Sequence, residues 1–330
     1  MPCTIISGGQ WGDEGKGKIA SYLALRDQPN ILCRAGLGPG AGHTVEHNGN
    51  TYKLRQIPSG FMNCDAKLLI GAGALINPEV LLGEVEKYSL NGRLRVDGRA
   101  TVIEQKHIEQ DTQQDHLTKV IQSTGSGHGP CLMDRALRTA KMVAQVDALQ
   151  PLAIDVATEV NAALERDLCV HIEGTNGFQL SVLYGTYPYT VSKDSTASTF
   201  AADVGVGPTR INDVVLVFKT FPTRVGHGPF PHELNDNEHN IQEFGTVTGR
   251  KRRVGRFDMD AALQAARINS ATQIALCFMD RIDPDCTGKT FEQLNREARS
   301  FIDQLESITN IPVTLIGTGP KTTDIIDRTQ

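Results

Sequence analysis

The feature that most constrains this chain is a glycine-rich segment directly after its first apolar run. Thr4 to Ser7 is short and β-branched, and GGQWGDEGKGK follows at residues 8 to 18. Residues 19 to 24 then have a helix-forming composition. Backbone amides without neighbouring Cβ atoms can close around phosphate groups, and the positive end of a helix favours anions there. We therefore expect a strand, a phosphate-binding loop and a helix at the start of the chain.

The loop departs from an ordinary P-loop at the position that should bind magnesium. Gly12 to Lys18 satisfies GxxxxGK, and Lys16 adds a second positive charge for a polyphosphate. Ile19 stands where a P-loop places its metal-binding Ser or Thr. Asp13 is the predicted oxygen ligand instead, and its carboxylate could also accept a proton from a substrate. The structural alternative is a tight strand-to-helix turn without a ligand.

A second glycine-rich loop, GLGPGAGHT, occupies residues 36 to 44. His43 lies near its end, preceded by glycine. A lone histidine is more often a structural residue than a catalyst, but in a ligand loop it can act as a general acid or stabilise a phosphoryl group. The residues of this loop alone leave both interpretations open.

Short β-branched runs alternate with helix-like stretches along the chain, which predicts an α/β fold with a largely parallel sheet. The expected strands are 4–7, 68–70, 169–172, 214–219, 274–278 and 313–316. The expected helices are 78–88, 154–166, 258–268 and 291–305. Repeats, low-complexity tracts and linkers are absent from the sequence, which favours one continuous domain over residues 1–330.

Composition limits the classes of partner. The 38 acidic and 33 basic residues give a net charge of -5, which does not favour binding to a nucleic-acid backbone. The 7 cysteines include no CxxC pair, so neither a disulfide framework nor a zinc site is indicated. No apolar stretch approaches the roughly 20 residues of a membrane span. We expect a cytoplasmic protein, in the host cytoplasm if a phage encodes it, with a small nucleotide as its ligand.

Together these motifs resemble the adenylosuccinate synthetase family. The resemblance runs in order along nearly the whole chain, through GGQWGDEGKGK (8–18), GAGHT (40–44), QIPSGF (56–61), GTYPY (185–189), TRVGHGPFP (223–231) and EFGTVTGRKRR (243–253). The compact length is similar to that of the short archaeal and phage members. The resemblance implies a P-loop-related α/β fold in which helices flank a large, mostly parallel central sheet. It also implies a homodimer, magnesium, and a ligase that joins L-aspartate to C6 of a purine 5'-monophosphate.

The resemblance also implies roles for individual residues. Asp13 would be the general base, His43 and Lys16 would stabilise the transferring phosphoryl group, and the Gly42 carbonyl would join Asp13 on the metal. The implied triphosphate site is Gly12, Asp13, Glu14, Gly15, Lys16, Gly17, Lys18, Gly42, His43, Thr44, Arg252, Asp280, Gly317 and Gly319. The implied acceptor site is Asp13, Lys16, Gly40, Ala41, Ser123, Thr124, Asn176, Val191, Arg250 and, from the partner subunit, Arg138. The implied aspartate site is Thr246, Val247, Thr248, Arg250 and Arg252.

Three departures from the family pattern concern the acceptor pocket. Gly40, Asn176 and Val191 stand where asparagine, glutamine and threonine are usual, so each change removes bulk or polarity. This favours dGMP as acceptor, the reaction of some phage members, which gives N6-succino-2-amino-2'-deoxyadenylate. Phe278 and Gly317 replace a lysine and a serine near the triphosphate base, which favours ATP or dATP over GTP.

Three alternatives stay open. One is IMP with aspartate and GTP, giving adenylosuccinate. Another, from a different class, is a non-catalytic purine-nucleotide sensor. A P-loop GTPase-type switch is disfavoured by Ile19. His128, at a variable family position, and Arg256, where tryptophan is common, are given no role.

Overall fold

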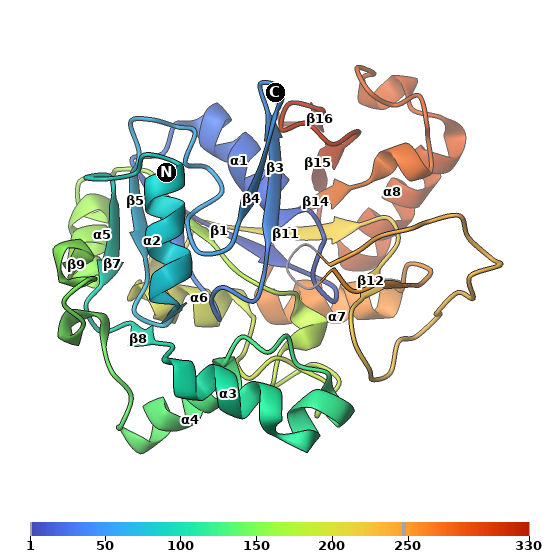
Figure 1. Cartoon of the computed structure of the whole chain (residues 1–330). Helices are drawn as coiled ribbons and strands as arrows, with labels where there is room; N and C mark the ends of the chain where they lie inside the picture. The colour runs from blue at the N-terminus through green and yellow to red at the C-terminus, as the bar shows by residue number, and fades with distance from the viewer. Residues whose placement is uncertain (1, 246–248, 330) are drawn as a thin grey trace.

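A sheet of ten strands forms the centre of the computed structural model, which describes residues 2–245 and 249–329. The strand order is β16-β15-β14-β11-β1-β10-β2-β5-β7-β9 (Figure 1), and neighbours are parallel except β15 and β16. The strands are β1 (Cys3–Gly8), β2 (Ile31–Arg34), β5 (Lys67–Ile70), β7 (Leu94–Asp97), β9 (Ala153–Ile154), β10 (Val170–Glu173), β11 (Asp213–Lys219), β14 (Gln273–Cys277), β15 (Val313–Gly317) and β16 (Ile325–Asp327). The predicted α/β class with a mostly parallel sheet is confirmed.

Helices cover both faces of this sheet, which explains why its strands are continuous apolar runs. Ile5 packs in a core with α5 and α6, and the next residue, Ile6, packs in a core with α1. Successive side chains of a strand point to opposite faces, so this alternation fixes the two helical layers. The flanking helices are α1 (Lys16–Asp27), α2 (Pro78–Lys87), α5 (Val156–Leu164), α6 (Ala197–Val204), α7 (Met259–Asn269) and α8 (Arg296–Thr309).

The helix boundaries follow local capping signals that the broad predictions did not resolve. Asp155 and Asn295 accept hydrogen bonds from backbone amides three residues on, so α5 and α8 begin after them. The helix predicted from Phe291 therefore begins later than expected, after a short 3-10 turn. The strand predicted to end at Phe278 ends one residue earlier, because Phe278 has a left-handed φ of 63°.

Several smaller elements complete the fold. β3 (His43–His47) and β4 (Asn50–Leu54) form a hairpin through an Asn-Gly turn, and α3 and α4 lie together below the main sheet in Figure 1. The remaining elements are β6 (Leu75–Ile76), β8 (Thr101–Val102), α3 (Gln105–Gln113), η1 (His116–Ile121), α4 (His128–Leu137), η2 (Val143–Gln145), η3 (Gln150–Leu152), η4 (Phe178–Leu180), η5 (Pro208–Arg210), β12 (Thr223–Arg224), β13 (Arg253–Val254), η6 (Met279–Arg281) and η7 (Phe291–Gln293). Within the described ranges, no helix has the length and apolar character needed to span a membrane.

Candidate functional site

A cavity of about 1150 Å³ opens where the carboxyl ends of the parallel strands meet the loops that follow them. It brings together most of the predicted site residues, including Gly12 to Lys18, Gly40 to Thr44, Ser123, Thr124, Asn176, Val191, Arg250, Arg252, Asp280 and Gly319. Two predicted residues, Arg138 and Gly317, are described but do not line it. Thr246, Val247 and Thr248 lie outside the described residues.

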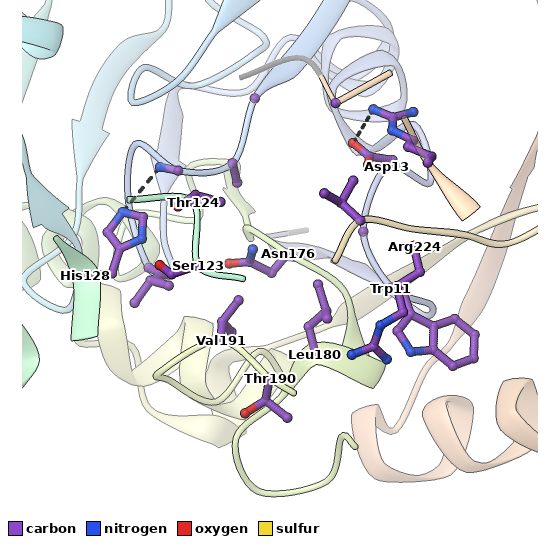
Figure 2. Close-up of a pocket in the computed structure, with 18 of the residues that line it drawn as sticks. Trp11, Asp13, Ser123, Thr124, His128, Asn176, Leu180, Thr190, Val191 and Arg224 are labelled. Atoms are coloured by element: carbon purple, nitrogen blue, oxygen red, sulfur yellow. Dashed lines mark hydrogen bonds and ion pairs between the residues drawn. The ribbon is translucent and has the colours of Figure 1, made fainter. Parts of the chain in front are cut away.

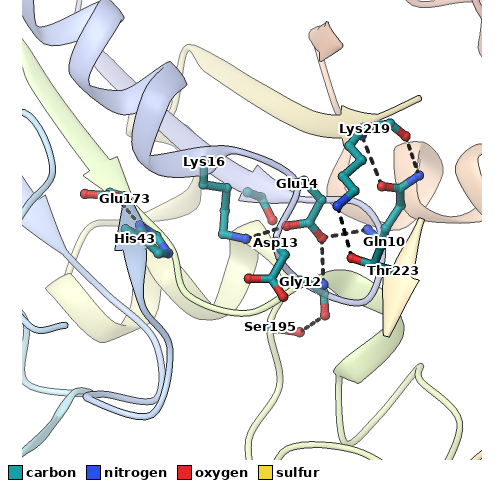
Figure 3. A network of polar contacts seen from close by, with 12 residues as sticks. Gln10, Gly12, Asp13, Glu14, Lys16, His43, Glu173, Ser195, Lys219 and Thr223 are labelled. Atoms are coloured by element: carbon teal, nitrogen blue, oxygen red, sulfur yellow. Dashed lines mark hydrogen bonds and ion pairs between the residues drawn. The ribbon is translucent and has the colours of Figure 1, made fainter. Parts of the chain in front are cut away.

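The loop between β1 and α1 is shaped by the carboxylate of Glu14. This side chain is fully buried, and its Oε1 accepts hydrogen bonds from the backbone amides of Gln10 and Gly12, both at 3.0 Å. Its Oε2 accepts from the Lys16 ammonium at 2.6 Å (Figure 3). Glu14 therefore folds inward and holds the loop, whose residues 12–18 line the cavity.

Two further contacts tie the loop to neighbouring strands. The Gln10 amide donates to the Lys219 carbonyl at 3.0 Å and accepts from the Lys219 backbone amide at 3.1 Å. The Lys18 ammonium donates to the carbonyls of Gly319 and, at 2.6 Å, Asp324. Lys18 was expected to contribute charge to a polyphosphate, and here its hydrogen bonds join the loop to the turn after β15.

Asp13 follows Gly12 in the loop, is held in the left-handed region with φ of 60°, and lines the cavity. Its Oδ1 lies 2.8 Å from Arg252 Nη2. Burial raises the pKa of Asp13, while the positive charges of Arg252 and Lys219 oppose that rise. A carboxylate with a raised pKa is a stronger base than an ordinary aspartate, which suits proton abstraction.

Behind Asp13 lies a buried chain of charges that the sequence did not reveal. Glu243 Oε2 accepts from Lys219 Nζ and from Arg252 Nη1, both at 2.7 Å. Lys219 is fully buried, and burial lowers the pKa of its ammonium. Its Nζ also lies 4.6 Å from the centre of the Phe278 ring. Arg252 is thus shared between Glu243 and Asp13, which fixes the guanidinium beside the candidate base.

His43 is the first residue of β3, and its ring is oriented by Glu173 at the end of β10 (Figure 3). Its Nδ1 contacts Glu173 Oε1, which also lies 2.7 Å from Arg34 Nη1. The backbone amide of Ser59 donates to Glu173 Oε2 at 2.7 Å. Because Nδ1 is engaged by the carboxylate, Nε2 is the nitrogen left for a ligand.

Burial and neighbouring charges shift the pKa values of both groups in this pair. Burial and the nearby Arg34 lower the pKa of His43 to about 4. Burial would raise the pKa of Glu173, but Arg34 and His43 outweigh it and lower that pKa to about 2. Without a ligand the pair therefore holds a neutral imidazole and an ionised carboxylate near neutral pH.

We expect the protein to lose stability on mild acidification because three buried histidines resist protonation. Burial lowers the pKa of His43, His128 and His171 to about 4, against an ordinary 6.5. The unfolded chain then binds more protons between these values, so the free energy of unfolding falls as the pH drops through them. Each histidine contributes up to about 1.4 kcal/mol per pH unit. Urea unfolding at about pH 7 and about pH 5 measures this, and equal stabilities would contradict it.

The acceptor side of the cavity is formed by the loop before α4 and the segment after β10. Figure 2 shows Ser123, Thr124, Asn176 and Val191 around one hollow. Arg250 braces the loop, because its guanidinium donates to the carbonyls of Gln122 and Ser123 at 2.9 and 2.8 Å. Arg250 was predicted to bind acceptor and aspartate, and its position at the loop is compatible with the first of these roles.

Residues with clear structural roles here were missed at the sequence level. Arg224, from the TRVGHGPFP motif, is 2% exposed and lines the cavity. Its guanidinium donates to the Tyr189 carbonyl at 2.7 Å and to the Thr186 hydroxyl at 2.9 Å, so it holds the segment that carries Val191. In the sequence, Glu173 is a charged residue at the end of an apolar run. Because buried carboxylates are seldom unpaired, this position could have indicated a buried glutamate with a cationic partner.

The oxygen donors present suit a magnesium ion that a ligand helps to hold. Within the described residues, no three His, Cys, Asp or Glu side chains form a cluster that could hold a metal. Asp13 and the backbone of Gly42 do line the same cavity. Magnesium is commonly bound by one or two carboxylates together with phosphate oxygens and water. The site therefore fits magnesium delivered with a nucleotide, where the ion would neutralise phosphate charge.

Comparison with known proteins agrees with this geometry. A family model described as adenylosuccinate synthetase matches residues 5–148 and 138–287. Adenylosuccinate synthetase from Methanocaldococcus jannaschii is 53% identical over 334 residues, covering 99% of this chain and 97% of that protein. The enzyme of the same name from Archaeoglobus fulgidus is 53% identical over 331 residues, covering 99% and 98%.

Two solved structures share the whole fold. Fully ligated adenylosuccinate synthetase from Plasmodium falciparum has a TM-score of 0.89 at 27% identity, covering 98% of this chain and 99% of that one. Succinoaminodeoxyadenylate synthetase from cyanophage S-2L, bound to dGMP and to dATP as energy donor, has a TM-score of 0.83 at 28% identity, covering 99% and 95%. The chain belongs to the adenylosuccinate synthetase family, a family of ligases that form C–N bonds.

Proposed function

We propose that this protein joins L-aspartate to C6 of IMP, with GTP as phosphoryl donor and magnesium as metal, to form adenylosuccinate. The observation that carries the proposal is that Asp13, Lys16 and His43 border one cavity with the acceptor loop. The archaeal relatives that are 53% identical carry the name of this activity. Retention of a base, a phosphate-binding lysine and an oriented histidine disfavours a non-catalytic sensor.

The first step uses the cavity's acid and base groups. Asp13 takes the proton from N1 of the 6-oxopurine, which turns O6 into a nucleophile. O6 then attacks the γ-phosphorus, the bond to the β-phosphate oxygen breaks, and GDP leaves. Lys16 and His43 would neutralise charge on the transferring group, and a bound magnesium would supply further neutralisation.

The second step is displacement of that phosphate. The aspartate amine attacks C6, and the C6–O6 bond breaks, so inorganic phosphate departs with the purine oxygen. Two carboxylates on the incoming amino acid require cationic partners, for which Arg252 and Arg250 are the proposed groups. Thr246, Val247 and Thr248 remain predicted contributors to aspartate binding.

dGMP with ATP or dATP is the second candidate, and it was the one favoured by the sequence. The cyanophage enzyme bound to dGMP and dATP has the same fold, and Val191 and Asn176 do line the acceptor hollow. One premise is weakened, however. The space beside Gly40 is filled by the His128 ring, so the loss of a side chain there does not enlarge the pocket. The archaeal proteins named adenylosuccinate synthetase are 53% identical to this chain, whereas the cyanophage enzyme is 28% identical. IMP is therefore the better-supported acceptor.

Phosphate release from purified protein tests the proposal. IMP, dIMP, GMP and dGMP are each compared with GTP, ATP and dATP, with and without aspartate and magnesium. We expect the highest aspartate-dependent kcat/KM with IMP and GTP. Preference for dGMP would transfer the assignment to the second candidate, and nucleotide binding without turnover on any acceptor would favour the sensor.

We also propose a homodimer in which Arg138 enters the partner's acceptor site. Arg138 lies at the carboxyl end of α4 and does not line its own cavity. On the same helix, Met133 and Leu137 are 62% and 68% exposed, which is unusual for large apolar side chains grouped together. A second copy covering this helix would account for both features.

Arg138→Leu is therefore expected to weaken IMP binding by roughly 10- to 100-fold, the scale of a lost charge-assisted hydrogen bond to phosphate. Equal mixing with an Asp13→Asn variant should restore about a quarter of wild-type activity, because half of the mixed dimers' sites regain both residues. Mixing Asp13→Asn with His43→Asn is the matched control and should restore nothing, since both residues come from one chain. Failure of the first mixture despite subunit exchange would argue against a shared site.

A further inference from the structure

Gly40 and His128 occupy one space between the two acceptor loops. A Cβ atom added to Gly40 would lie 2.2 Å from Cε1 and 3.0 Å from Nδ1 of His128. Gly40 does not have a left-handed φ, so what excludes a side chain at this position is space and not backbone conformation. The ring of His128 therefore stands where a side chain at position 40 would otherwise reach.

The hydrogen bonding of His128 fixes which ring nitrogen can donate. The backbone amide of Gly40 donates to Nε2 at 3.3 Å, drawn as a dashed line in Figure 2. The side chain is 7% exposed, and burial, together with Arg55, lowers the pKa of His128 to about 4. A neutral imidazole that accepts at Nε2 carries its proton on Nδ1. Nδ1 makes no hydrogen bond to any residue that the structure describes, and His128 lines the cavity.

The surroundings of Nδ1 favour an anion. His128 is the first residue of α4, a helix of 10 residues whose first turn holds no acidic side chain. A Cβ atom added to Gly40 would lie 3.0 Å from Nδ1 and 3.2 Å from the Thr124 hydroxyl oxygen. Both groups therefore border the same space. Val191, across this hollow, offers no hydroxyl. A buried donor, a hydroxyl and a helix start therefore converge here. The Asp111 carboxylate, which also lines the cavity, accepts from the Gly127 backbone amide at 2.8 Å.

We propose that His128, whose ring occupies the space beside Gly40, binds the 5'-phosphate of the acceptor nucleotide by donating its Nδ1–H. The ligand class is a phosphate monoester dianion on a nucleoside. This rests on the proposed function, which places a purine monophosphate on this side of the cavity. His128 thus determines affinity for the acceptor and takes no part in the bonds that form and break.

Calorimetric binding of IMP, without triphosphate or aspartate, tests this role. His128→Phe keeps a flat ring but cannot donate, and should weaken IMP binding by roughly 10- to 100-fold. His128→Gln can accept from Gly40 and still donate, so it should recover most of the affinity. His47→Gln, a half-buried histidine outside the cavity, is the control and should bind IMP normally.

Inosine, which lacks the 5'-phosphate of IMP, tests whether His128 acts on the phosphate or on the rest of the nucleotide. Its weaker binding should be the same in wild type and His128→Phe, because it lacks the group that His128 contacts. Equal weakening for IMP and inosine, or unchanged IMP binding, would overturn the proposal. Since no turnover is involved, a protein that binds IMP in this way but forms no product would refute the proposed function alone. If wild type binds neither IMP nor dGMP, both proposals fail.

The shared space gives an independent test that does not depend on His128→Phe folding. Gly40→Asn alone should weaken IMP binding strongly, because its side chain collides with the ring. Adding His128→Ala should restore binding, since the amide of the new asparagine can then enter the vacated space. If the double variant binds no better than Gly40→Asn, the two positions do not substitute for one another and the proposal is wrong.

Discussion

Asp13→Asn is expected to lower kcat by roughly 10²- to 10⁴-fold, the range over which a positioned general base contributes. The amide is nearly the same size but cannot take the N1 proton, so O6 stays a poor nucleophile. Nucleotide binding should persist because Glu14, and not Asp13, holds the loop amides in place. Steady-state kinetics with calorimetry on the same preparations separates the two effects.

The pH profile of the wild type provides a second view of this residue. Burial raises the pKa of Asp13, so the active, ionised form is lost as the pH falls through a value above that of an ordinary aspartate. The acidic limb of kcat/KM should lie correspondingly high and be absent from the residual activity of Asp13→Asn. Asp236→Asn, an exposed aspartate paired with Lys251, is the control and should behave as wild type. Near-normal turnover by Asp13→Asn would refute its assignment as the base.

Glu173→Ala is expected to cost about 3–5 kcal/mol of unfolding free energy, because it leaves a buried cation without its partner. Arg34 is 2% exposed, and two of its guanidinium nitrogens already lack partners among the described residues. The same change frees the His43 ring, so kcat should fall as well. Urea unfolding and steady-state kinetics measure the two consequences.

The control for Glu173→Ala is a variant that breaks a solvent-accessible ion pair. Glu159→Ala removes the partner of Lys67, whose side chain is 46% exposed, and should change stability by about 1 kcal/mol or less. Comparable losses for the two variants would contradict the view that Glu173 compensates a buried charge.

Much of the site could be predicted because its signals are local. The order of strand, glycine loop and helix is written into residues 4 to 24, and parallel strands bring their following loops to one edge. The match of motifs then placed Arg250, Arg252 and Asp280 at the same cavity. The contacts that could not be predicted depend on the register between strands that are distant in the sequence. Glu173 meets Arg34 because β10 and β2 pair with those residues side by side.

Other features were missed because their signals are weak or depend on packing. α3 and α4 are short, and polar residues fill most of the α3 sequence, so no clear apolar stripe announces that helix. Glu14 turns inward from a segment in which Gly12, Asp13 and Gly15 all have a left-handed φ, a conformation that the sequence pattern does not specify. The absence of a side chain at Gly40 suggested a larger pocket, and only the packing shows that His128 fills the space.

The most direct test of the central claim follows the purine oxygen. IMP labelled with oxygen-18 at C6 is incubated with the protein, GTP, magnesium and aspartate, and the released phosphate is examined by phosphorus NMR or mass spectrometry. If O6 is phosphorylated and then displaced by aspartate, each phosphate carries one labelled oxygen and adenylosuccinate carries none from that position. Unlabelled phosphate alone would mean that water, and not the purine oxygen, received the phosphoryl group, and would contradict the ligase mechanism proposed for this cavity.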